Sequence, residues 1–191
     1  MAEFRRGRRL GLDWGDARIG VAECDPDGLV AYPRDTVAAG PAELVQLAAI
    51  VAAVEPLEVV VGLPRSLNGS EGPAAVKVRE RAAALAAALI AGGVAVPVRL
   101  VDERLSTVSA SRRLREGGRK ARAQRGVIDM AAAAEILEHA LAVERASGVA
   151  AGELVSSTVP VDEAVRTSAD LEGDPPRDID ARPGGQAEPG A

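Results

Sequence analysis

The chain has 191 residues, of which 47% are hydrophobic and 2% aromatic, so a folded core has to be built mainly from Ala, Val, Leu and Ile. Its formal net charge of -5 is uneven, because residues 151–191 hold nine acids and three bases, which leaves 19 acids and 20 bases for residues 1–150. The acidic balance therefore does not exclude an anionic ligand for the larger part of the chain.

The single cysteine, Cys24, excludes an internal disulfide and a zinc site made of several cysteines. No uncharged run reaches the length of a membrane span, and the start of the chain lacks the pattern of a signal peptide. We therefore expect a cytoplasmic protein without a membrane partner.

Three short apolar segments follow a basic N-terminal arm at residues 1–9. They are expected as strands at about Leu10–Trp14, Arg18–Cys24 and Leu29–Asp35, with turns rich in Gly and Asp between them. Strands joined by such short turns predict an antiparallel meander.

Helical and strand patterns alternate after the meander. Helices are expected from about 41 to 55 and from about 73 to 91, and short apolar strands at 57–62 and 94–101. Such strands, each preceded by a helix, are typical of parallel pairing. A helix after Ser106, a basic loop and a last helix from about 127 to 145 complete this part.

The fold class is therefore α/β, with one mixed five-stranded sheet in which two parallel strands extend the meander and helices flank the sheet. We expect a domain over residues 10–146. Residues 147–191, rich in Gly, Ser, Pro and acids without periodicity, are expected to be a disordered acidic tail.

Three carboxylates at separate positions are candidate metal ligands. Asp13 ends a hydrophobic strand, Glu103 follows the last strand, and Asp129 lies near the start of the last helix; Asp102 is a fourth candidate. Carboxylates that converge from separate elements can bind divalent ions for phosphodiester hydrolysis. The alternatives are a surface ion pair of Glu103 with Arg104 and a helix-terminal role for Asp129.

A basic segment at 112–125 carries seven cations and one acid, Glu116. This density suits contact with a nucleic-acid backbone, although charge runs are also common on solvated surfaces. The cations of the segment are Arg112, Arg113, Arg115, Arg119, Lys120, Arg122 and Arg125.

Four motifs in this order resemble one family. They are Leu12-Asp13-Trp14-Gly15-Asp16-Ala17-Arg18-Ile19-Gly20-Val21-Ala22, Val60-Val61-Gly62-Leu63-Pro64 with Asn68-Gly69-Ser70-Glu71, Val101-Asp102-Glu103-Arg104-Leu105-Ser106-Thr107, and Ile128-Asp129-Met130-Ala131-Ala132 with Ile136-Leu137. On these residues the chain resembles the YqgF family, also called RuvX, of pre-16S rRNA nucleases similar to Holliday junction resolvases.

The resemblance implies an RNase H-like fold and an acidic site of Asp13, Glu103 and Asp129. It also implies dependence on Mg²⁺ or Mn²⁺ and a role in trimming the 5′ end of precursor 16S rRNA. Arg18 and Arg104 match motif positions and are candidates for phosphate contact or carboxylate orientation. Trp14 stands where a smaller apolar residue is common in the family, and the acidic tail lies outside the resemblance.

Two other functions stay open at this point. One is a resolvase that acts on four-way DNA, and the other is an RNA-binding ribosome-assembly factor without catalysis. The expected partners are structured RNA, namely pre-16S rRNA, or branched DNA, with pre-ribosomal particles as a further partner. The protein is expected as a monomer or homodimer.

Overall fold

The computed structural model describes residues 4–66, 68–103 and 122–156, with the side chains of 122–128 excepted. The chain divides into a first unit, Met1–Val159, and a second unit, Pro160–Ala191, that lies outside the described residues. The fold below is that of the first unit. Within the described residues, no helix is long and apolar enough to cross a membrane.

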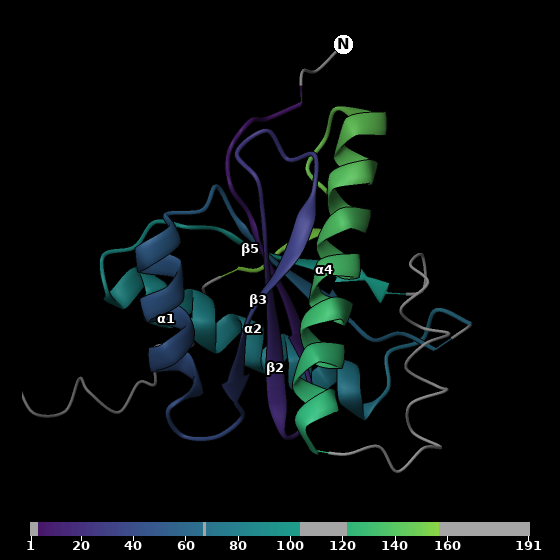
Figure 1. The fold of residues 1–191 in the computed structure, drawn as a ribbon. Coiled ribbons are helices and arrows are strands. Elements are labelled where there is room, and N and C mark those ends of the chain that lie inside the picture. Colours follow the sequence, from purple (N-terminus) through teal and green to yellow (C-terminus); the bar gives the residue numbers. More distant parts are fainter. Residues whose placement is uncertain (1–3, 67, 104–121, 157–191) are drawn as a thin grey trace, which may run out of the picture. The chain divides into compact units, whose positions relative to one another are not determined.

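One mixed sheet forms the centre of this unit, in the strand order β3-β2-β1-β4-β5-β6 (Figure 1). Strand β1 pairs antiparallel with β2, which pairs antiparallel with β3, while β1, β4 and β5 run parallel to one another. The elements are β1 (Leu10–Trp14), β2 (Arg18–Cys24), β3 (Ala31–Ala38), α1 (Glu43–Val54), β4 (Val59–Leu63), α2 (Pro73–Ala91), β5 (Val98–Asp102), α4 (Arg122–Ser147) and β6 (Glu153–Leu154).

This arrangement confirms the predicted α/β, RNase H-like architecture, with a meander extended by two parallel strands. The structure adds a sixth strand, β6, from residues assigned to the tail by their composition. Gly152, at φ +78°, allows the chain to turn back onto β5, where the N–H of Val155 donates to the carbonyl of Val98 at 2.9 Å. A two-residue strand has too little periodicity to be recognised from sequence. The remainder of the predicted tail, from residue 157, lies outside the described residues.

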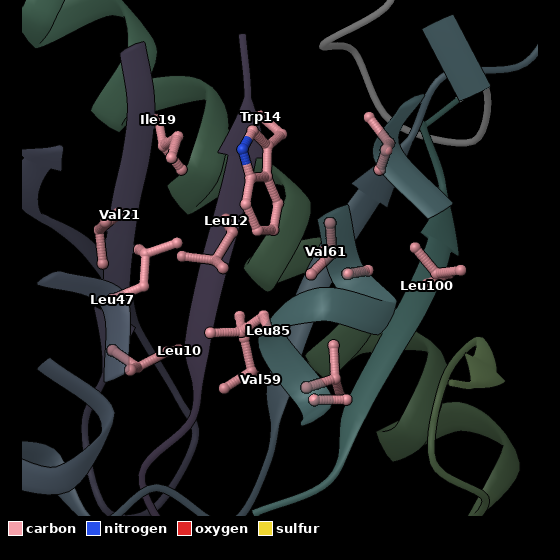
Figure 2. Packing of buried hydrophobic residues seen from close by; sticks show 14 of the residues in the cluster. Leu10, Leu12, Trp14, Ile19, Val21, Leu47, Val59, Val61, Leu85 and Leu100 are labelled. Atoms are coloured by element: carbon pink, nitrogen blue, oxygen red, sulfur yellow. The ribbon is translucent and has the colours of Figure 1, made fainter. Parts of the chain in front are cut away.

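The two faces of the sheet pack against different helices (Figure 1). Along β1, Leu10, Leu12 and Trp14 face α1 and α2, where they contact a core that includes Leu47 and Leu85 (Figure 2). Because side chains alternate along a strand, Gly11 and Asp13 face the opposite side, toward α4. The central strand therefore presents its carboxylate to α4 and its apolar side chains to the main core.

Helix α4 lies unusually close to the sheet because small residues line both surfaces. A Cβ atom on Gly11 would stand 2.7 Å from the carbonyl oxygen of Ala133 and 2.8 Å from Cβ of Leu137. Ala132, Ala133 and Ala140 of α4 are buried in the same contact. The layer between the helix and the sheet is therefore thin and rich in alanine, and it contains few of the large side chains that aromatic residues would supply.

A buried ion-pair network joins the N-terminal arm to the far end of the sheet. The guanidinium of Arg9, itself buried, contacts Glu58 at 3.1 Å and Glu144 at 3.0 Å. Arg5 contacts the same two carboxylates, at 2.8 Å and 2.7 Å, and Arg99 of β5 contacts Glu58 at 3.1 Å. Multiple charged hydrogen bonds of this kind offset the cost of burying the carboxylates. The basic arm is therefore bound into the fold and ties the start of β4 to the C-terminal part of α4.

The pKa of Glu144 reflects this network. Burial by itself would raise it, but the hydrogen bond from Arg5 and the charges of Arg9 and Arg5 outweigh burial and lower the pKa below its ordinary value. A carboxylate whose pKa is lowered in the folded state stabilises the protein at pH values above its unfolded pKa of about 4.3. This stabilisation is lost as the pH falls through the pKa of the folded state.

We predict that Gly11→Ala lowers the free energy of unfolding by about 1–3 kcal/mol, because the added methyl group forces α4 away from β1. Gly92→Ala is the control, since its Cβ would meet no atom closer than 3.4 Å and its φ is negative. It should change stability by less than about 0.5 kcal/mol. Urea denaturation of both variants measures the difference, and equal stability of the two would contradict the close packing described here.

We also predict that Glu144→Gln destabilises the protein at pH 7 by about 3 kcal/mol, because it leaves two arginines short of a buried charge partner. Urea midpoints of the wild type should fall as the pH is lowered below about 5, and this fall should be shallower in the variant. Glu138→Gln, at an exposed position of the same helix, is the matched control. A wild-type and a Glu144→Gln curve with the same pH dependence would show that Glu144 does not contribute in this way.

Candidate active site

Asp13 occupies the centre of the sheet, next to the carboxyl end of β1. It lies opposite Gly20 of β2 and is 7% exposed. The side chains that flank it in sequence, Leu12 and Trp14, are buried in the core on the other face. An ionisable group in such a position is costly to bury without compensation, and the elements around it decide what that compensation is.

The backbone of Asp129 in α4 lies close to Gly20 of β2, which pairs with Asp13. A Cβ atom on Gly20 would collide with the carbonyl oxygen of Asp129 and would stand 2.9 Å from the nitrogen of Met130. The backbone of α4 at Asp129 thus lies directly over the glycine that pairs with Asp13. Asp129 lies well inside α4, which begins at Arg122 and not at the predicted residue 127. The helix-terminal alternative for this carboxylate is therefore excluded.

Glu103 enters the same face from the end of β5. It directly follows the strand and is buried. A Cβ atom on Gly62 of β4 would collide with Oε1 of Glu103 and would stand 2.5 Å from Cδ1 of Ile136 in α4. The side chain of Glu103 therefore lies over the last part of β4, between β5 and α4, and not on the outer surface as the ion-pair alternative required.

Asp13 and Glu103 share one face and one edge of the sheet, and the backbone of α4 at Asp129 packs on that face. β1, β4 and β5 are parallel, so their carboxyl ends meet at this edge, and Asp13 and Glu103 lie at two of these ends. Ligand sites of open α/β sheets are found at the carboxyl ends of parallel strands. Glycines at 20 and 62 leave the space above the neighbouring strands to Asp129 and Glu103.

Within the described residues, no group of three or more Asp, Glu, His or Cys side chains stands close enough to form a complete metal site. The donor set nevertheless has the right chemistry, because carboxylate oxygens are the ligands of Mg²⁺ and Mn²⁺. Mg²⁺ takes one or two protein carboxylates and completes its shell with water and phosphate oxygens. The residues present therefore fit such an ion as a partial cage, not as a closed one.

Asp102, the fourth candidate, faces the other way. It alternates with Glu103 along the chain, and its Oδ2 lies 3.7 Å from the guanidinium of Arg65 in the loop after β4. Asp102 thus belongs to the loop on the α2 side of the sheet and not to the acidic face.

The predicted cations fall into two groups. Arg18 is the first residue of β2 and alternates with Gly20, so it lies on the acidic face at the same edge. Arg122 and Arg125 belong to the first part of α4, which corrects their placement in a loop. Arg104, Arg112, Arg113, Arg115, Arg119 and Lys120 lie outside the described residues.

The loop between β4 and α2 is fixed by charge. Hydrogen bonds from Arg79 and then Arg65, at 2.7 Å and 2.8 Å, lower the pKa of Glu71 to about 2. Arg79 also binds Glu153 of β6 at 2.9 Å. These ion pairs connect the loop at the carboxyl end of β4 to the edge strand. Sequence analysis did not identify them, because Glu153 is distant from Arg79 in the chain and the partners of Glu71 are brought together by the path of the loop.

Gly20 and Gly62 stand beside the candidate carboxylates, a role that sequence analysis did not assign to them. Their signal was present in the sequence: each stands at a strand position whose side chain would otherwise fill the space beside a candidate carboxylate. Without knowledge of which helix crosses which strand, that signal could not be interpreted.

Comparisons with known proteins find similar sequences over most of the chain. A family model described as "RuvX: Holliday junction resolvase" matches residues 7–143. A protein of Nocardioides sp. strain JS614, named as a candidate pre-16S rRNA nuclease, is 55% identical over 160 residues, which cover 81% of this chain and 100% of the relative. A protein of Streptomyces coelicolor with the same name is 56% identical over 158 residues, covering 82% and 92% of the two chains. The structure of Thermus thermophilus RuvC in complex with a Holliday junction covers 76% of this chain, with a TM-score of 0.48 and 19% identity.

Proposed function

The chain belongs to the RuvX family, and on that premise we propose that it is a metal-dependent nuclease that hydrolyses phosphodiester bonds at the 5′ end of precursor 16S rRNA. Such a role belongs to ribosome biogenesis in the cytoplasm, on free precursor RNA or on pre-ribosomal particles. The names of the relatives at 55% and 56% identity support RNA as the substrate.

The observation that supports the proposal is the placement of Asp13 and Glu103, both buried, at the carboxyl ends of parallel strands on the face that α4 covers. The backbone of α4 at Asp129 lies over Gly20, the partner of Asp13 in β2. Asp13 and Glu103 are both buried on the face that α4 covers, and a bound divalent cation would offset part of the cost of burying their charges.

We propose that these three carboxylates hold Mg²⁺ or Mn²⁺. When bound, divalent ions supply an activated water and stabilise the leaving oxygen in phosphodiester hydrolysis. The partial cage described above leaves coordination positions for water and for the phosphate of the substrate. Asp13, as the most central of the three, would be the ligand whose loss is least compensated by the other two.

Cations around this edge would bind the RNA backbone. Among the described cations, Arg18 lies on the acidic face, on the strand next to Asp13. We include Arg104, Arg112, Arg113, Arg119, Lys120, Arg122 and Arg125 in this role on the basis of their charge density in the sequence. Contact with phosphates fixes the position of the RNA and makes affinity dependent on salt.

A four-way DNA junction is the second candidate substrate, favoured by the description of the matching family model. Cleavage of precursor 16S rRNA and of a synthetic junction should be compared at equal enzyme concentration. A resolvase would act as a dimer and give paired symmetric cuts in the junction, whereas the RNA nuclease would shorten the precursor rRNA.

We predict that Asp13→Asn lowers Mg²⁺- or Mn²⁺-dependent cleavage of precursor 16S rRNA by at least about 10²-fold, since even outer-shell partners of a metal contribute about 10–100-fold. Asp27→Asn is the control, because Asp27 is exposed in the turn between β2 and β3, at the opposite end of the sheet. It should cleave as the wild type does. Equal cleavage by wild type and Asp13→Asn would refute the assignment of the acidic site.

We further predict that Arg18→Ala weakens RNA binding and lowers the slope of log affinity against log salt by about 0.7–0.9, as expected for one lost phosphate contact. Binding is measured in EDTA, so that cleavage does not interfere. Arg6→Ala removes an exposed cation from the opposite end of the molecule and should leave the slope unchanged. The same slope for Arg18→Ala and wild type would remove Arg18 from the binding surface.

A further inference from the structure

A cluster of ion pairs lies at the same edge of the sheet, on the side of α2. We call it the Arg65 cluster. Arg65 belongs to the loop after β4, where its guanidinium is 2.8 Å from the carboxylate of Glu71 and 3.7 Å from that of Asp102. Arg79 of α2 binds Glu71 at 2.7 Å and Glu153 of β6 at 2.9 Å. The cluster thus joins the loop, α2 and β6 to the last residue of β5.

The position of Asp102 links this cluster to the acidic face. The parallel register of β4 and β5 ends at Asp102, and the antiparallel register of β5 and β6 reaches Leu100. Glu103 is therefore the first residue beyond both registers. The contact of Arg65 with Asp102 continues the connection between β4 and β5 past their last pair.

The reach of Glu103 makes the end of β5 a sensitive position. Neighbouring strands lie about 4.8 Å apart, so β1 and β5, on either side of β4, are about 10 Å apart. The side chain of Glu103 spans part of this distance, since its Oε1 lies over Gly62 of β4. Ligands of a metal site have to be held within about 0.5 Å of their working geometry. A metal ion shared by Asp13 and Glu103 therefore depends on how firmly the end of β5 is held.

The charges of the cluster favour a positioning role over contact with phosphate. Two arginines face three carboxylates, so the cluster carries a formal charge of -1. Arg65 is shared by two of these carboxylates, and its side chain is 29% exposed. A phosphate would have to compete with carboxylates that already hold the guanidinium. Arg65 is thus placed to hold groups of the protein itself.

The two arginines of the cluster have different tasks. Without Arg65, Glu71 keeps Arg79, which donates to it twice at 2.7 Å. Without Arg79, Glu71 and Glu153 would both lose a partner. Arg79 therefore holds the cluster together, whereas Arg65 connects it to Asp102. Loss of Arg65 should leave the fold intact and release the end of β5.

We infer that Arg65 is a positioning residue for the acidic site: by holding Asp102 it fixes the end of β5, and with it the place of Glu103 over Gly62. In this role Arg65 touches neither the metal nor the substrate. The inference rests on the proposed metal-dependent nuclease function, and it extends that function with a residue from the opposite face of the sheet.

The experiment measures binding of Mn²⁺ to the full chain by electron paramagnetic resonance of the free ion, and it involves no cleavage. The relevant binding is the part that Asp13→Asn removes. Arg65→Leu should weaken this binding at least about tenfold, within the range found for groups that orient metal ligands. Loss of a positive charge by itself would strengthen the binding of a cation, so the direction of the change separates positioning from charge.

Lys77→Leu is the matched control, because it removes an exposed cation at the same edge, where Lys77 lies 3.8 Å from the carboxylate of Asp16. It should bind Mn²⁺ at least as tightly as the wild type. The melting temperature of Arg65→Leu without metal should stay close to that of the wild type, since Glu71 keeps Arg79. Arg65→Gln, a milder change, should also weaken Mn²⁺ binding, and it decides the case if Arg65→Leu does not fold.

A double-mutant cycle tests whether Arg65 acts through Asp102. Asp102→Asn should weaken Mn²⁺ binding at least about fivefold more in the wild-type background than in the Arg65→Leu background, because the contact that it breaks is already absent there. A residue that merely stabilised the fold would show no such coupling in metal affinity.

Two results would overturn the inference: Mn²⁺ binding by Arg65→Leu equal to that of the wild type, or equal effects of Asp102→Asn in the two backgrounds. Either result would retain the metal site as long as Asp13→Asn abolishes binding. Mn²⁺ binding that Asp13→Asn leaves unchanged would instead refute the metal site itself.

Discussion

The close approach of α4 to the sheet is the constraint on which the rest of the structure depends. Glycines at 11, 20 and 62 present no side chain to the helix. The backbone of α4 fills the space above Gly11 and Gly20, and the side chains of Glu103 and Ile136 fill the space above Gly62. This contact brings the backbone of Asp129 over the glycine opposite Asp13, and lets Glu103 lie across β4. A larger side chain at any of these positions would separate the carboxylates before it affected the main core on the other face.

The buried ion pairs fix the opposite end of the same helix. Arg5 and Arg9 bind Glu144 in the C-terminal part of α4 and Glu58 ahead of β4. In a chain with few aromatic residues, these pairs supply directional contacts that an alanine-rich interface lacks. Breaking one of them is costly because it leaves a charge buried and unpaired. The arginines of the N-terminal arm thus stabilise the fold, whereas the arginines near the acidic face are proposed to bind RNA.

The sequence was informative wherever periodicity and local order decide the structure. The meander, the parallel strands β4 and β5, and the carboxylates at strand ends all follow from alternation and from runs of apolar residues. It was uninformative where contacts join distant segments. The partners of Arg9, the pairing of β6 with β5 and the ion pair of Arg79 with Glu153 depend on the tertiary arrangement. The start of α4 was misplaced because Arg and Gly at 122–126 were read as a loop, although arginine is a good helix former and one glycine costs a helix only about 1 kcal/mol.

The central claim is that Asp13, Glu103 and Asp129 hold divalent metal at the carboxyl edge of the sheet. Anomalous diffraction from crystals grown with Mn²⁺ tests it most directly, because the ion is located without reference to activity. We expect an anomalous peak within about 2.0–2.3 Å of carboxylate oxygens of Asp13 and of at least one of the other two residues. A peak elsewhere, or no peak at these carboxylates at millimolar Mn²⁺, would contradict it.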